Sequence, residues 1–121
     1  MDDNREQYRA LIDSLVYACR EGQGQVGPDR ARRGVWNPQA ARQRDDMPGQ
    51  QRMNVLLASL GEADREVVAE MLLEAFESGV HETLVTLHEA EVPLFKEGYE
   101  GTPFHDFAER LPGWPWPIGQ N

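Results

Sequence analysis

The chain has 121 residues, a length typical of one domain and sufficient to bury a core without disulfides or metal ions. A net charge of −9 argues against non-specific binding to nucleic acid, because a polyanion would be repelled. The first residues, MDDNREQ, are charged, and no apolar run reaches the ~18 residues of a membrane span. We therefore expect neither a signal peptide nor a membrane anchor, and a cytoplasmic location.

The charge is distributed unevenly along the chain. Residues 53–121 carry thirteen acidic side chains against three basic ones, whereas residues 22–52 carry six arginines against three aspartates. The sequence therefore joins an Arg-rich segment to an acidic C-terminal part of opposite sign.

An amphipathic helix is predicted over about residues 3–20. Its apolar side chains recur at the i, i+3, i+4, i+7 spacing of one helix face: Tyr8, Leu11, Ile12, Leu15, Val16 and Cys19. Cys19 is the only cysteine, which excludes an intramolecular disulfide and a cysteine-based metal cage. Its place in the apolar face indicates a small buried hydrophobe rather than a reactive thiol.

Residues 22–50 show no periodicity, and Gly, Gln, Pro and Arg dominate them. We expect a long surface loop here, with a short helical turn around residues 38–44. The run Gly22-Gln-Gly24-Gln-Val-Gly27 matches G-x-G-x-x-G, but a dinucleotide site needs this motif between a strand and a helix. Because it follows a helix, we interpret the run as a flexible linker and predict no cofactor.

Two further helices are predicted in the middle of the chain. The first runs from about Pro48 to Leu60, and its apolar stripe is Met53, Leu56, Leu57 and Leu60. The second has an apolar pattern from Val68 to His88 that keeps a single helical phase across Gly79. It is either one helix of nearly thirty residues or two nearly collinear helices, and we expect a kink near Gly79 because glycine weakens a helix.

The C-terminal part begins with a clear helix start. Thr102 is expected to cap a short helix with Pro103 at its first position, and this helix should last to about Leu111. The tail Trp114-Pro-Trp116-Pro cannot be helical and should be extended, with both indoles on apolar surface.

Taken together, these patterns predict an all-α fold without a significant sheet. It is a compact bundle of four to five helices around a long central helix kinked near Gly79. We expect a single domain over residues 1–121, with the loop at about 22–50 and the extended tail at 112–121.

No group of residues predicts a specific reaction, and we assign no catalytic residue and no metal ligand. His81 and His88 are two helical turns apart, about 10.5 Å along the axis, which is too far for one ion without further ligands. His105 and Asp106 are adjacent in a helix and point about 100° apart, and no serine or cysteine nearby completes a nucleophilic set.

The Arg-rich segment is a candidate binding site. Its arginines and Trp36 resemble the groups that hold phosphate and stack bases, but the acidic remainder of the chain counts against nucleic acid. We expect the arginines to pair with the acidic helices or with an acidic partner. The acidic helices could instead imitate a phosphate backbone or dock on a basic partner, although a charged face is most often only a solvated one. The expected binding residues are Arg30, Arg32, Arg33, Tyr99, His105, Asp106, Trp114 and Trp116.

Three segments of the C-terminal third carry a resemblance to a known family: residues 78–84 (SGVHETL), residues 97–107 (EGYEGTPFHDF) and residues 110–117, which begin with Arg-Leu and end with Gly-Trp-Pro-Trp-Pro. With these segments the chain resembles a family of small acidic bacterial proteins of unknown function. The likeness spans about residues 53–117 and the first helix. It implies a soluble bacterial protein but no activity, cofactor or ligand, so no functional residue is carried over.

Two classes of function remain. In the first, the protein is non-catalytic and binds another macromolecule, as a small regulator, adaptor or inhibitor. Its partner is then another protein or a second copy in a homodimer, while a membrane and nucleic acid are disfavoured. In the second, it is a small metal-binding protein or enzyme that uses His81, His88 or His105 with nearby carboxylates. Elemental analysis of untagged protein discriminates between the two classes, because the second predicts a stoichiometric metal.

Overall fold

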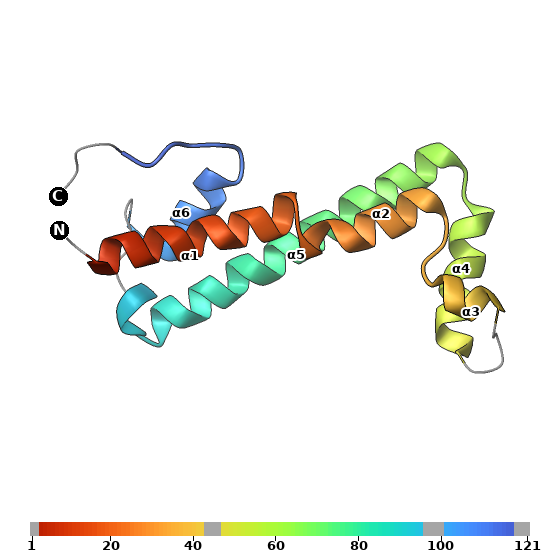
Figure 1. The fold of residues 1–121 in the computed structure, drawn as a ribbon, viewed down its shortest axis with the longest axis horizontal. Helices are drawn as coiled ribbons and strands as arrows, with labels where there is room; N and C mark the ends of the chain where they lie inside the picture. The colour runs from red at the N-terminus through yellow and green to blue at the C-terminus, as the bar shows by residue number, and fades with distance from the viewer. Residues whose placement is uncertain (1–2, 43–46, 96–100, 118–121) are drawn as a thin grey trace. The chain divides into compact units, whose positions relative to one another are not determined.

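A computed structural model describes residues 3–42, 47–95 and 101–117, and within these ranges the chain forms only helices and their connections (Figure 1). No described residue belongs to a strand, which confirms the all-α class. By its internal contacts the chain separates into two compact units, residues 1–21 with 77–121 (unit 1) and residues 22–76 (unit 2). That the two units form a single domain stays a prediction.

Unit 1 is built on helix α1, Asp3–Arg20, which packs against helix α6, Pro103–Arg110, and the short 3-10 helix η3, Pro93–Phe95. The end of helix α5, Glu62–Glu89, completes the unit. The predicted apolar face of α1 is confirmed at Tyr8, Ile12 and Cys19, which are buried. The buried apolar side chains of the unit are Tyr8, Ile12, Cys19, Leu84 and Phe107.

Helix α6 begins as its sequence predicts. The Thr102 hydroxyl accepts a hydrogen bond from the backbone N–H of His105 at 3.2 Å, and Pro103 occupies the first helical position. The N–H groups at a helix start lack partners within the helix, so both residues fix where α6 begins. Residues 114–117 have no regular secondary structure, in agreement with an extended tail, while the remainder of the tail lies outside the described residues.

Helix α5 is continuous through Gly79 over its 28 residues, which settles the choice between one helix and two. The Thr83 hydroxyl donates to the Gly79 carbonyl at 2.8 Å, four residues back along the helix. A kink near Gly79 stays a prediction.

Unit 2 contains more helix than the sequence predicts. After the 3-10 helix η1, Gln23–Gln25, come α2, Val26–Arg33, and α3, Pro38–Arg42. Helix α4, Pro48–Ser59, agrees with its prediction, and the start of α5 completes the unit. Residues 23–33 are thus helical where the sequence predicts a loop and a flexible linker at Gly22–Gly27, while the short helical turn expected around residues 38–44 is observed as α3. The described residues form six α-helices, of which α3 has only five residues.

The missed helix, α2, buries small residues instead of large ones. Gly24, Pro28 and Ala31 are the buried positions of η1 and α2, and they follow helical spacing. A search for large apolar side chains cannot detect such a face. Pro28 is compatible with the helix because it lies in the first turn, where backbone N–H groups have no partner within the helix.

The end of α2 depends on Gly34, whose φ of +79° is in the left-handed region. Its N–H donates to the carbonyls of Ala31 and Arg30 at 3.0 and 3.1 Å, which closes the helix. The guanidinium of Arg65 packs directly over it: a Cβ at this position would lie 2.1 Å from Nη1 of Arg65.

The segment after α2 is fixed by Asn54 of α4. Its Oδ1 accepts from the backbone N–H groups of Trp36 and Asn37 at 2.6 and 2.9 Å, and its Nδ2 donates to the Asn37 carbonyl at 2.8 Å. One amide side chain thus binds three backbone groups. This is why Trp36 and the start of α3 are held against α4.

The two glycines of this region should respond oppositely to alanine substitution. Gly27→Ala should stabilise unit 2 by up to about 1 kcal/mol, because alanine favours a helix. Its new Cβ would lie 3.5 Å from Trp36 and 3.7 Å from Leu72, an ordinary contact distance. Gly34→Ala should destabilise the protein by about 1–2 kcal/mol or more, since alanine is strained in the left-handed conformation and Arg65 must move.

Urea denaturation of both variants, with Gly49→Ala as a control whose Cβ meets nothing within 4 Å, measures these changes. A Gly34→Ala protein as stable as the wild type would contradict this description of the α2 terminus.

Candidate functional site

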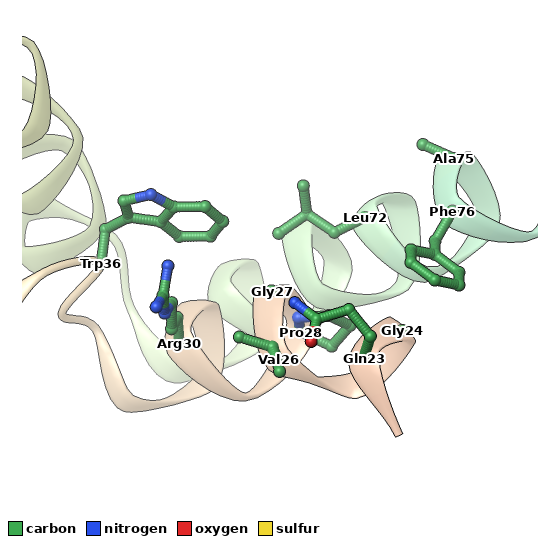
Figure 2. Close-up of a pocket in the computed structure, with 10 residues that line it drawn as sticks. All are labelled: Gln23, Gly24, Val26, Gly27, Pro28, Arg30, Trp36, Leu72, Ala75 and Phe76. Carbon is green, nitrogen blue, oxygen red and sulfur yellow. The ribbon is translucent and has the colours of Figure 1, made fainter. Parts of the chain in front are cut away.

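An open apolar groove lies in unit 2 between α2 and the start of α5 (Figure 2). Trp36, Leu72 and Phe76 supply its large apolar side chains, while Gly24, Gly27 and Pro28 supply backbone and small surfaces. Its volume is about 390 Å³, within the range of ligand-binding clefts. Besides backbone, the polar groups of its lining residues are the Gln23 amide, the Arg30 guanidinium and the Trp36 indole N–H.

Arg30 and Trp36 form one end of this groove, and Figure 2 shows the guanidinium beneath the indole, with Phe76 at the other end. The Arg30 Cζ lies 5.2 Å from the indole centroid, a cation–π distance. The Arg30 guanidinium makes no hydrogen bond or ion pair with any residue that the structure describes. Its charge is therefore held in place without being neutralised.

The other two predicted arginines of α2 behave differently from Arg30. Arg32 pairs with Glu66 of α5 through two contacts of 2.9 and 3.2 Å, as expected for arginines that fold back on an acidic helix. This hydrogen bond lowers the pKa of Glu66 and raises that of Arg32. Arg33 is exposed and makes no such contact within the described chain.

A second feature of unit 2 is apolar surface that nothing in the described chain covers. Met53 and Leu56 belong to the predicted stripe of α4, yet they are 45% and 58% exposed, and Val55 beside them is 63% exposed. Val67 and Met71 of α5 are exposed as well. Only Leu57 and Leu60 of the stripe enter the core, where they join Ala31, Ala69 and Leu72.

The predicted tryptophans lie in unit 1, where Trp116 packs on helix α1. The Arg9 and Arg110 guanidiniums lie 5.3 and 5.1 Å from its ring centroid, and its Nε1 donates to the Asp13 carboxylate at 3.0 Å. Arg110 also pairs with Asp13 at 2.7 Å. Trp114 contacts the Trp116 ring edge-on at 5.4 Å. The tail thus covers its own chain, and these indoles serve packing.

Asp106 is fully buried and accepts a hydrogen bond from the hydroxyl of Tyr8. A buried carboxylate needs such a donor, so this contact ties α6 to α1. His105 beside it is exposed, so the structure does not bring the two side chains into one site. Tyr99, the remaining predicted binding residue, lies outside the described residues.

His81 and His88 flank the ring of Phe104, with centroid distances of 5.4 and 5.7 Å and edge-on geometry. Nδ1 of His88 lies 3.1 Å from the carbonyl oxygen of Phe95. Both imidazoles therefore have packing roles. Within residues 3–42, 47–95 and 101–117, no three His, Cys, Asp or Glu side chains are grouped as metal ligands.

The predicted binding residues are divided between the two units. Arg30, Arg32 and Arg33 belong to unit 2, while His105, Asp106, Trp114 and Trp116 belong to unit 1. The sequence did not indicate the groove, because its walls depend on Gly24, Gly27 and Leu72 coming together from different helices. A possible signal was the small-residue spacing of Gly24, Pro28 and Ala31, which is typical of close helix packing.

Comparison with protein families shows that residues 1–118 match a family of unknown function (DUF6547), and the chain belongs to this family. This confirms the resemblance to an uncharacterised family. No curated protein and no solved structure matches the chain. Among the described residues, no helix is both long and apolar enough to cross a membrane.

Cys19 is completely buried, which agrees with its prediction as a core residue. Burial raises the pKa of its thiol from 9.0 to about 11, with Glu77 adding to the rise and Arg20 opposing it. At neutral pH we expect iodoacetamide to alkylate Cys19 only after unfolding, as mass spectrometry would measure. Rapid alkylation of the native protein would contradict the burial.

The same shift predicts a pH dependence of the folding free energy. The folded state holds the Cys19 thiol proton more tightly than the unfolded state does. The contribution of this group to the free energy of unfolding is therefore complete below pH 9 and is lost as the pH rises toward about 11.

The contact between Asp13 and Trp116 makes a further prediction. Asp13→Ala should lower the free energy of unfolding by about 1 kcal/mol, because it removes the acceptor of the indole N–H and the partner of Arg110 on a partly exposed surface. Tryptophan emission should shift to longer wavelength as Trp116 leaves α1. Glu6→Ala, an exposed position of the same helix, is the control and should change neither quantity.

Proposed function

We propose that this chain is a non-catalytic, cytoplasmic bacterial protein that acts by binding other proteins, as a small regulator, adaptor or inhibitor. The observation that carries the proposal is the uncovered apolar surface of helix α4 in unit 2. Large exposed apolar side chains that lie close together are typical of interaction surfaces, whereas single scattered ones are not. Val55 and Leu56 line one shallow groove of α4 together with Arg52 and Ser59, and Met53 lies one helical turn from Leu56.

The first occupant that we propose for this surface is a second copy of the chain. Residues 22–76 carry eight acidic and seven basic side chains, so unit 2 is almost neutral. Unit 1, by contrast, carries thirteen acidic against five basic residues. Two copies that meet through α4 therefore avoid the charge repulsion that two copies of unit 1 would face.

The composition of α4 supports the same contact. Arg52 is the one charged residue between Pro48 and Gly61. Its neighbours on the exposed side, Val55, Leu56 and Ser59, are apolar or small. A two-fold symmetric dimer buries the same patch on both copies, which suits a short, nearly uncharged helix face.

Leu56→Glu should convert the protein to a monomer, because a carboxylate in an apolar contact loses its hydration without gaining a partner. Sedimentation velocity over a range of protein concentrations measures this change. Leu56 is 58% exposed, so circular dichroism should be unchanged.

The matched control is Ala58→Glu. Ala58 is exposed on the same helix, but two residues from Leu56, so its side chain points about 160° away. This variant should associate like the wild type. A wild-type protein that is monomeric at every concentration would overturn the proposed dimer.

A further inference from the structure

The groove of Figure 2 combines an apolar floor with a single uncompensated cation. We propose that it binds a short segment of a partner protein in which a large apolar side chain stands beside an aspartate or glutamate. This inference deepens the proposed interaction role by naming the ligand of a second surface, and it uses residues that the α4 contact does not.

The apolar half of the ligand follows from the walls of the groove. Leu72 and Phe76 are one helical turn apart on α5, and Trp36 lies across from Gly27 on α2. Gly27 has no side chain, so Trp36 and Leu72 pack close to the backbone of α2, and all three residues line the groove. We expect a side chain such as Leu, Phe or Trp to bind against these walls, because its burial removes apolar area from water.

The acidic half follows from the charges around Arg30. Arg32 on the same helix is already paired with Glu66, and Arg33 does not line the groove. Arg30 lines the groove, is half-buried, and is oriented by the Trp36 ring. A carboxylate on the ligand would gain a charge-assisted hydrogen bond from a guanidinium that loses little freedom on binding.

The open form of the groove favours a protein segment over a small molecule, since small-molecule sites usually enclose most of their ligand. Nucleic acid is disfavoured by the carboxylates of the same unit, which include Glu66, Glu70 and Glu74 on α5. An acidic protein segment carries one or two charges and a side chain for the floor, so it matches both parts of the groove.

The test is selection from a phage-displayed library of random peptides of about 12 residues on the full-length wild-type protein. Enriched peptides should share an acidic residue next to a Leu, Phe or Trp. Synthetic versions with a fluorescent label, measured by anisotropy, should lose about tenfold or more in affinity for Arg30→Glu.

The matched control is Arg33→Glu, which makes the same charge change one turn further along α2 and outside the groove. It should change the affinity by less than about threefold. Ala75→Glu provides a second groove variant at an exposed helix position, should Arg30→Glu fail to fold, and it should also weaken binding.

The proposal is overturned if no peptide is enriched, if the enriched peptides lack an acidic residue, or if Arg30→Glu and Arg33→Glu weaken binding equally. Enriched peptides displaced by a single-stranded DNA oligonucleotide at equal concentration would favour nucleic acid instead and also overturn it.

Leu56→Glu, assayed with the same peptides, separates the two proposals. If this variant still binds the peptides, the groove does not depend on self-association, and a monomeric protein would leave the groove proposal intact. Conversely, a selection that enriches no peptide would leave the proposed α4 dimer intact.

Discussion

The packing of small residues in α2 against α5 is the constraint on which unit 2 depends. Ala31 of α2 and Ala69 of α5 are completely buried, and both belong to the core cluster with Leu57. Alanine and glycine residues let two helices pack backbone near backbone, and the larger side chains then pack around the contact. Trp36, Val68 and Leu72 surround it here.

This close contact also creates the groove. Gly27 lets Trp36 and Leu72 pack against the backbone of α2, while the short turn at Gly34 brings the chain back so that Trp36 can lie over Arg30. Asn54 then fixes the backbone of Trp36 and Asn37. The packing of α2 against α5 therefore determines both the core of unit 2 and the orientation of the Arg30 guanidinium.

The two units differ in the surroundings of their tryptophans and arginines. In unit 1, the Trp116 indole lies near two arginines and its N–H is bound by Asp13. In unit 2, the Arg30 guanidinium lies against the Trp36 ring without a hydrogen bond or ion pair to any described residue, and Met53, Val55 and Leu56 of α4 are exposed. We therefore propose the interaction role for unit 2, whereas the tryptophans of the tail pack within unit 1.

The sequence by itself determined the all-α class, the buried face of α1, the continuous apolar phase of α5 and the start of α6 at Thr102, because each depends on local spacing or on a local cap. It did not determine α2, since the buried face of that helix is made of Gly24, Pro28 and Ala31, which carry no periodic hydrophobic signal. It also put Met53 and Leu56 in one apolar stripe with Leu57 and Leu60, but the first two are exposed. Amphipathic spacing shows that a face is apolar, but only the tertiary structure decides whether another element covers it, and the groove exists only where two helices meet.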